Sequence, residues 1–284
     1  MKPFTAAVVQ LTTTEDQERS LASAEDLVAD AAGHGASLVA LPENVSFMGP
    51  ETQKQRLAES EGGPTFERLS RCAAQHHVWL LGGTLPERGQ VPNKAYNTLT
   101  VFAPDGRLAA KYRKIHLFDI ALGEGATHQE STSVLPGESA VLVHTPLAKI
   151  GLSVCYDVRF AALYRALRRA GAEILAVPAA FTVPTGRDHW EVLLRARAIE
   201  NQCYVLAPAQ VGANTETRRT FGRAMIIDPW GTLLAICPDR PSYALAEIDL
   251  GHVADLRRRM PCLDHERPVA YERVIEAKMD SRSD

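Results

Sequence analysis

The chain has 284 residues, of which 45% are hydrophobic and 23% are charged, and its formal net charge is −3. This composition is ordinary for a globular protein and excludes a largely disordered chain. The near-neutral charge argues against a general nucleic-acid binder, which would carry a strong basic excess. No segment approaches the ~18 consecutive apolar residues that a membrane helix needs.

The cysteines and the N-terminal segment indicate the cellular compartment in which the protein is expected. The chain has five cysteines, an odd number, and none of them form a C-x-x-C pair. This pattern argues against a disulfide framework and suits a reducing compartment. The apolar run at the N-terminus is also too short for a secretory peptide. We therefore expect a cytoplasmic protein.

The first third of the chain alternates short apolar runs with helical patterns. Strands are predicted at 4–10, 36–41 and 78–82. Helices are predicted at 21–32 and 66–75, where apolar residues recur at helical spacing. This order predicts a sheet that is covered by helices.

The rest of the chain adds more strands. The Ala-Pro-Asp-Gly sequence at 103–106 is typical of a turn, so 96–102 and 108–112 are a predicted hairpin. Beyond it we predict, in chain order, strand 150–154, helix 161–170, strand 174–177, helix 189–201, and strands 204–207, 223–227, 233–237 and 243–248. No linker-like run divides the chain. We therefore predict one domain over 1–275, with two packed sheets flanked by helices, and a flexible tail at 276–284.

Two strand ends and one basic segment carry side chains that could take part in catalysis. Glu43 and Cys155 each follow a predicted strand, and in open α/β sheets sites gather at the carboxyl ends of strands. Each also has an ordinary structural explanation. Cys155 would be a small buried hydrophobe, Glu43 a helix cap or loop residue, and Lys114 one of a solvated basic group.

Together these three groups could hydrolyse an amide. A nearby lysine lowers the pKa of a thiol, and a nearby carboxylate can take its proton, so that Cys155 could attack a carbonyl carbon. Lys114 would neutralise the oxyanion that forms. Glu43 would protonate the leaving amine and then deprotonate the water that hydrolyses the thioester. Sequence spacing alone does not show that the three converge.

Three segments resemble motifs of a known family: 41–43 (LPE), 112–119 (YRKIHLFD) and 151–157 (GLSVCYD). In this order they resemble the nitrilase, or carbon–nitrogen hydrolase, superfamily, and the resemblance extends over nearly the whole chain. It implies an α/β fold that forms a four-layer α-β-β-α sandwich. It further implies Glu43 as base, Lys114 as oxyanion cation and Cys155 as nucleophile. A second glutamate near the lysine matches Glu130.

The residues after the nucleophile indicate a branch of the superfamily. Segment 155–160 (CYDVRF) resembles the Nit branch, which hydrolyses ω-amides of 2-oxo acids. This resemblance implies that Arg159 binds a substrate carboxylate, a role that suits a bidentate guanidinium. It also implies that Tyr156, Phe181 and Thr185 line the same pocket.

Three further segments refine the expected substrate. Segments 189–200, 202–205 and 228–232 are most similar to amidases of deaminated glutathione, in which the glutamyl amine of glutathione has become a ketone. Such an enzyme would release 2-oxoglutarate and cysteinylglycine from this small molecule. The sequence departs from the pattern of this family at two arginines that bear on substrate specificity. Arg223 stands where relatives usually have a histidine, and Arg187 lies in a Gly-Arg-Asp segment that is unusual for the family. We expect both to add positive charge near the mouth of the site.

Other functions stay open from the sequence. The chain could be an ω-amidase of 2-oxoglutaramate or 2-oxosuccinamate, or a carbamoyl-amide hydrolase. Outside the superfamily, it could be a cysteine–histidine hydrolase with His116 or His189 as base, or an inactive scaffold.

The expected partners follow from motifs and from the resemblance. No metal-ligand spacing and no nucleotide motif occur, so we expect no metal and no other cofactor. We also expect no nucleic-acid or membrane partner. The resemblance implies a homodimer or homotetramer with contacts in 165–170 and 257–261.

Overall fold

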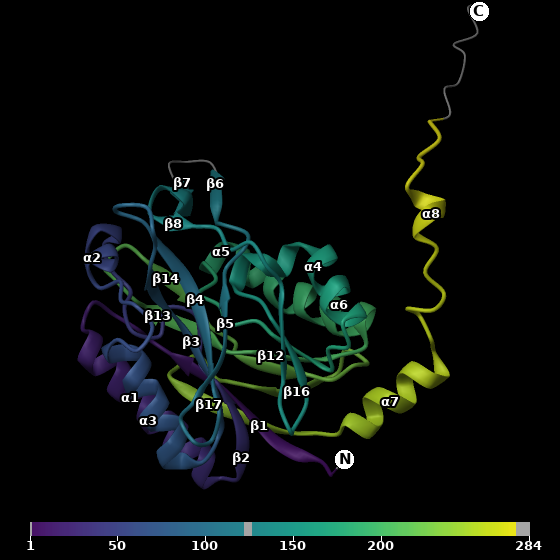
Figure 1. The fold of residues 1–284 in the computed structure, drawn as a ribbon, viewed down its shortest axis with the longest axis horizontal. Coiled ribbons are helices and arrows are strands. Elements are labelled where there is room, and N and C mark those ends of the chain that lie inside the picture. Colours follow the sequence, from purple (N-terminus) through teal and green to yellow (C-terminus); the bar gives the residue numbers. More distant parts are fainter. Residues whose placement is uncertain (1, 122–126, 277–284) are drawn as a thin grey trace, which may run out of the picture.

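The computed structural model describes residues 2–121 and 127–276, and in them four layers of secondary structure pack together (Figure 1). Two β-sheets form the inner layers, and helices cover the outer face of each sheet. This arrangement confirms the predicted α-β-β-α sandwich. Residues 1 and 122–126 of the predicted domain, and 277–284 of the predicted tail, lie outside the described residues.

The larger sheet is built around β1 (Phe4–Leu11). Its strands follow the order β14–β13–β1–β2–β3–β4–β5, while β17 also pairs with β1 and β8 with β4. The strands β1, β2 and β3 are parallel, and β4 and β5 continue the sheet antiparallel. The other strands are β2 (Ala36–Ala40), β3 (Trp79–Arg88), β4 (Ala95–Phe102), β5 (Leu108–Arg113), β8 (Val134–Leu135), β13 (Ala209–Ala213), β14 (Arg219–Phe221) and β17 (Ser242–Ile248).

The smaller sheet has three parallel strands at its centre, namely β10 (Lys149–Leu152), β11 (Ile174–Ala176) and β12 (Tyr204–Ala207). Antiparallel strands extend it on both sides. These are β9 (Val141–His144), β15 (Met225–Ile227) and β16 (Leu233–Ile236). A separate two-stranded sheet pairs β6 (Asp119–Ala121) with β7 (Thr127–Gln129).

Helices complete the sandwich. The helices α1 (Gln17–Gly33) and α3 (Pro64–His76) cover the larger sheet, and α4 (Ala161–Arg169) and α6 (Glu191–Asn201) cover the smaller one. The remaining helices are α2 (Glu51–Arg56), α5 (Val183–Thr185), α7 (Leu250–Arg259) and α8 (Pro268–Tyr271), and α8 projects away from the body (Figure 1). None of the described helices is both long and apolar enough to span a bilayer.

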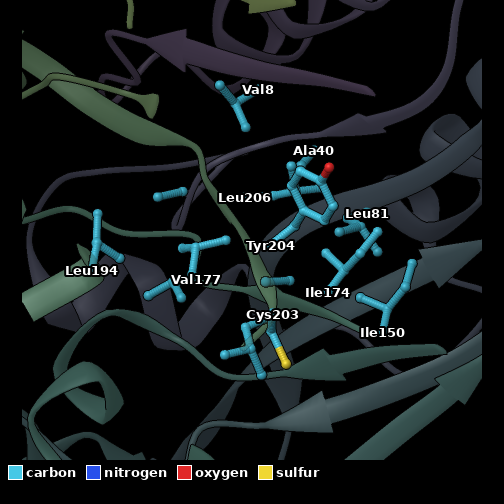
Figure 2. Packing of buried hydrophobic residues seen from close by; sticks show 14 of the residues in the cluster. Val8, Ala40, Leu81, Ile150, Ile174, Val177, Leu194, Cys203, Tyr204 and Leu206 are labelled. Atoms are coloured by element: carbon cyan, nitrogen blue, oxygen red, sulfur yellow. The ribbon is translucent and has the colours of Figure 1, made fainter. Parts of the chain in front are cut away.

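Side chains from both sheets form the main core. On β1, Ala6 and Val8 pack between the sheets, whereas Ala7 and Val9 pack in a second cluster with helices α1 and α3. Successive residues of a strand point to opposite faces, so β1 is buried on both of its faces. Figure 2 shows residues of both sheets in the main core, among them Val8, Ala40, Leu81, Ile150, Ile174 and Leu206. This packing fixes the strand ends relative to one another.

The predicted elements differ from the structure mainly at their ends. Strand 78–82 continues to Arg88, because β3 stays paired with β4 beyond a bulge. Strand 223–227 begins only at Met225, since Gly222 and Arg223 adopt positive φ angles of 82° and 60°. Helix 189–201 begins as α6 at Glu191, after a π-helical turn. Several elements have no counterpart among the predicted ones, namely β8, β9, β13, β14, the two-stranded sheet of β6 and β7, and the helices α2, α5, α7 and α8.

Glu87 on β3 carries a buried ionic network that supports a stability prediction. Its carboxylate accepts hydrogen bonds from Lys111 Nζ at 2.7 Å and Arg113 Nε at 3.0 Å. Burial acts to raise the pKa of Glu87, but these partners lower it from 4.5 to about 2. The carboxylate therefore stabilises the fold above pH 4.5, and this contribution is lost as the pH falls toward 2.

Replacing Glu87 by Gln is expected to lower the free energy of unfolding by about 3 kcal/mol at pH 7, at about 1.4 kcal/mol per pKa unit. Urea unfolding of both proteins should show this difference shrinking below pH 4.5. The control is Glu61→Gln, because Glu61 pairs with the same Lys111 but is 59% exposed, and it should cost less than about 1 kcal/mol. Equal losses in both variants would contradict the prediction.

Candidate active site

A cavity opens where the ends of several strands meet. Its empty volume is about 890 Å³, including the space at its mouth that is open to solvent. Glu43, Lys114, Glu130 and Cys155 all line it. The structure therefore brings together the four residues that were predicted as catalytic, although they lie far apart in the sequence.

Glu43 follows β2 by three residues and is 3% exposed. Its Oε1 accepts hydrogen bonds from Asn97 Nδ2 at 2.8 Å and from Lys114 Nζ at 3.1 Å. Its Oε2 accepts one from the backbone N–H of Ala180 at 2.9 Å. Three donors from three segments thus fix the orientation of this carboxylate beside the cavity.

Lys114 comes directly after β5, and its side chain is 2% exposed. Besides the bond to Glu43, its Nζ donates to both carboxylate oxygens of Glu130, at 3.1 and 2.8 Å. Burial acts to lower the pKa of Lys114, but the carboxylates of Glu130 and Glu43 raise it well above its usual value. Lys114 is therefore a fixed cation at neutral pH.

Glu130 is the second carboxylate that holds this cation. It begins a short 3₁₀ helix after β7, and its Oε2 also accepts the backbone N–H of Phe118 at 2.7 Å. Burial acts to raise the pKa of Glu130, but the positive charges of Lys114 and Lys54 lower it to about 2. Glu130 therefore stays ionised and keeps Lys114 in place.

Cys155 lies at a sharp turn between β10 and a short 3₁₀ helix. Its φ angle is +49°, which is costly for a residue other than glycine. Buried Asp157 supports the turn, because it accepts hydrogen bonds from the Tyr112 hydroxyl at 2.7 Å and from the backbone N–H of His116 at 3.0 Å. Tyr112 and His116 flank Lys114 in the chain, so Asp157 joins the cysteine turn to the segment with the cation.

The Cys155 thiol is neutral in this environment. Burial and the Glu43 carboxylate raise the pKa of Cys155 well above its usual value, although Lys114 acts in the opposite direction. Lys114 thus acts on the thiol in the predicted direction, but burial and Glu43 outweigh it, so the thiol is not made acidic overall. A thiol of this kind becomes nucleophilic when its proton moves to an adjacent base.

The predicted substrate-binding residues separate into two groups. Tyr156, Phe181 and Thr185 line the cavity, but Arg159 does not. The Arg159 guanidinium carbon lies 5.7 Å from the ring centroid of Tyr156 and 5.5 Å from that of Phe181. The Nη1 atom of Arg159 also lies 3.3 Å from His189 Nδ1. Arg159 therefore borders two of the aromatic rings of the cavity wall, and its carboxylate-binding role stays a prediction.

Two other arginines were expected to add positive charge near the mouth of the site, and this stays a prediction. Neither Arg187 nor Arg223 lines the cavity. Arg187 is exposed, and Arg223 Nε pairs with Asp239 at 2.9 Å. The cations that line the cavity together with Lys114 are Lys54 and Arg218.

The cysteine–histidine alternative has no support in this geometry. The predicted bases His116 and His189 do not line the cavity with Cys155. His116 Nδ1 lies 2.7 Å from a carboxylate oxygen of Asp157, and its ring stacks on Phe160. The carboxylate of Glu43 is the base candidate inside the cavity.

Comparison with known proteins identifies the family of this chain. Residues 5–258 match the carbon–nitrogen hydrolase family. A deaminated glutathione amidase from Synechocystis is 47% identical over 269 residues, which is 93% of this chain and 98% of the relative. The chain is a member of the carbon–nitrogen hydrolase family. A deaminated glutathione amidase from Homo sapiens is 44% identical over 93% of this chain and 83% of its own length.

A solved structure confirms the fold of this carbon–nitrogen hydrolase. Nit3 of Saccharomyces cerevisiae, a member of branch 10 of the nitrilase superfamily, is 30% identical. It superimposes with a TM-score of 0.83 over 92% of this chain and 95% of Nit3. The family match and this structure together confirm the resemblance that the three motifs carried.

The site of this hydrolase also contains residues that sequence analysis missed. Asn97 of β4 donates from Nδ2 to Glu43 Oε1 at 2.8 Å and to Glu130 Oε1 at 3.3 Å, and so bridges the two carboxylates. A polar amide in the middle of an apolar strand is the signal that could have revealed it. The N–H groups of Ala180 and Phe118 leave no such signal, because every residue except proline has one.

No metal site is evident in the part of this carbon–nitrogen hydrolase that the structure describes. There, no group of three or more His, Cys, Asp or Glu side chains is arranged to hold a metal ion. The expectation that the reaction needs no cofactor stays a prediction.

Proposed function

We propose that this hydrolase cleaves the ω-amide bond of deaminated glutathione and releases 2-oxoglutarate and cysteinylglycine. The names and the 41–47% identity of its relatives support this substrate. The observation that carries the chemistry is the contact of Lys114 Nζ with both Glu43 and Glu130 in the cavity that Cys155 lines. This arrangement pairs a nucleophile with a base and a fixed cation.

In the first half of the reaction, the Cys155 sulfur attacks the amide carbon while its proton moves to Glu43. The Lys114 ammonium neutralises the oxyanion of the tetrahedral intermediate. When the C–N bond breaks, Glu43 gives its proton to the leaving nitrogen, and cysteinylglycine departs as an amine. The 2-oxoglutaryl group stays on the sulfur as a thioester.

Water completes the reaction. Glu43 takes a proton from the attacking water, the C–S bond breaks, and the proton returns to the sulfur. Glu130 acts as a positioning residue, because it holds Lys114 and does not need to exchange protons. We further propose that Arg159 binds the carboxylate of the 2-oxo acid, and that Tyr156 and Phe181 form the wall against which this end of the substrate lies.

Release of 2-oxoglutarate from deaminated glutathione and from 2-oxoglutaramate tests the proposed function. The wild-type protein should prefer deaminated glutathione by about tenfold or more, and Cys155→Ala should release nothing from either compound. Equal or reversed preference would identify an ω-amidase of short oxo-amides. No release from either compound would overturn the proposed function and direct the search to other amides and to carbamoyl compounds.

We also propose a homo-oligomer in the cytoplasm. The C-terminal segment supports the oligomer, because Val269, Tyr271, Val274 and Ile275 are all more than 60% exposed. Exposed apolar side chains that gather on one short segment are candidates for a protein–protein contact. The odd number of cysteines supports a reducing compartment. Sedimentation of the full chain would give the number of subunits.

A further inference from the structure

The cavity has two cations that the chemistry above does not use. Lys54 and Arg218 line it together with His128. The three carboxylates that line it are Glu43, Glu51 and Glu130, and Lys54 and Arg218 supply two of the three compensating positive charges. Without them the cavity would carry a clear negative excess and would repel an anionic substrate.

Arg218 lies in the turn between β13 and β14, and this turn is firmly held. Its carbonyl oxygen accepts the backbone N–H groups of Asn214 and Thr215, at 3.0 and 3.2 Å. The Asn214 side chain is anchored in turn to the Thr13 carbonyl and the Thr220 hydroxyl. The Arg218 guanidinium, in contrast, has a buried Nε without a hydrogen-bond partner. A buried donor of this kind requires a partner.

Lys54 lies on α2, one turn after Glu51, so both side chains are on the same face of the helix. The Glu51 carboxylate is engaged by the Ser133 hydroxyl at 2.8 Å. Among the described residues, no carboxylate oxygen lies within 4.0 Å of the charged nitrogens of Lys54 or Arg218. Both cations are therefore available to an anionic ligand in the cavity.

The proposed substrate has a second carboxylate that these cations fit. Its leaving group, cysteinylglycine, ends in a carboxylate two residues from the scissile nitrogen, or about 7 Å in an extended chain. Its other carboxylate belongs to the 2-oxo acid, on the opposite side of the scissile bond. The Arg159 guanidinium borders Tyr156 and Phe181 of the cavity wall, whereas Lys54 comes from α2 and Arg218 from the turn between β13 and β14. A substrate that is anchored at both ends would thus cross the site.

We propose that Lys54 and Arg218 bind the terminal carboxylate of the leaving group and so select substrates whose departing amine carries this charge. This inference rests on the proposed function, since it assigns the far end of the same substrate. It explains why a cavity for amide hydrolysis carries cations away from the reacting atoms. An unsubstituted ω-amide releases ammonia and has no group to bind there.

Lys54→Met and Arg218→Met, separately and combined, test this assignment. Each single variant should lower kcat/KM for deaminated glutathione by about 10-fold and the double variant by about 100-fold, mainly through KM, as expected for lost charge-assisted hydrogen bonds. The change in kcat/KM for 2-oxoglutaramate should be much smaller. A deaminated glutathione with a C-terminal amide should be a poor substrate of the wild type, and the double variant should not distinguish it from the acid.

Matched controls are Arg56→Met and Arg219→Met, exposed residues near the two cations that do not line the cavity. Both should keep the wild-type preference. Unchanged discrimination in the double variant would overturn this inference alone. An equal loss on 2-oxoglutaramate would also overturn it, because the cations would then hold the 2-oxo acid end. Failure of the wild type to cleave deaminated glutathione would instead overturn the proposed function, and this inference with it.

Discussion

Glu43→Gln is expected to lower kcat for deaminated glutathione by at least 10²-fold and up to about 10⁴-fold, the range for loss of a general acid–base. One carboxylate serves every proton transfer in the proposed reaction, from the thiol, to the leaving amine, from the water and back to the sulfur. An amide in its place cannot take the thiol proton. The raised pKa of Cys155 makes this loss severe, because the resting thiol does not ionise by itself.

Steady-state and burst kinetics would check this prediction. The glutamine also disturbs the hydrogen bonds of the site, because the carboxylate accepts from Lys114, Asn97 and the Ala180 N–H. A measurement of the thermal midpoint therefore accompanies the kinetics. The control is His189→Gln, an exposed residue outside the cavity lining. If His189→Gln lost activity while Glu43→Gln kept it, a cysteine–histidine mechanism would replace the one proposed.

Lys114→Met is expected to lower kcat by about 10²- to 10³-fold, which is the effect of losing one oxyanion donor. It should also destabilise the fold by about 3 to 5 kcal/mol, because it leaves two buried carboxylates without their cation. The pKa of Glu130, about 2 in the intact site, should then rise, since the charge that lowers it is removed. Stability of the variant should therefore improve as the pH is lowered from 7 toward 5.

Urea unfolding across this pH range and single-turnover kinetics would measure both effects. Lys111→Met is the matched control, because Lys111 also bridges two carboxylates, Glu61 and Glu87, but lies outside the cavity. It should lose stability and keep turnover. A Lys114→Met enzyme with wild-type kcat would rule out the proposed role of this cation.

Much of the fold could be predicted from local sequence. Strands such as 36–41 are short apolar runs between turn signals, and helix 161–170 is marked by Gly171 just past its end. These elements could be predicted because the spacing of their apolar residues and the turn residues at their ends are local features of the sequence. The pairing of β17 with β1 could not be predicted in the same way, because it joins strands more than 200 residues apart through packing. The strands β6 and β7 of the two-stranded sheet are too short for their residues to show a periodic pattern.

The site was predictable to a different extent. The motifs around Glu43, Lys114 and Cys155 predicted the proposed reacting groups through their resemblance to the family, and the structure brings these residues to one cavity. The direction of the thiol pKa could not be predicted, since it depends on burial and on how many carboxylates surround one cation. Lys54 and Arg218 were missed because they come from a short helix and a turn, where a cation is ordinarily a solvated surface residue.

The neutral thiol has a consequence for survival of the enzyme in the presence of oxidants. Peroxides and alkylating agents react with thiolates, and their rate follows the ionised fraction and the exposure of the sulfur. Cys155 is 8% exposed and its pKa is raised. Burial and a raised pKa both lower the ionised, accessible fraction of this sulfur, so we expect Cys155 to react slowly with peroxides and alkylating agents when no substrate is bound.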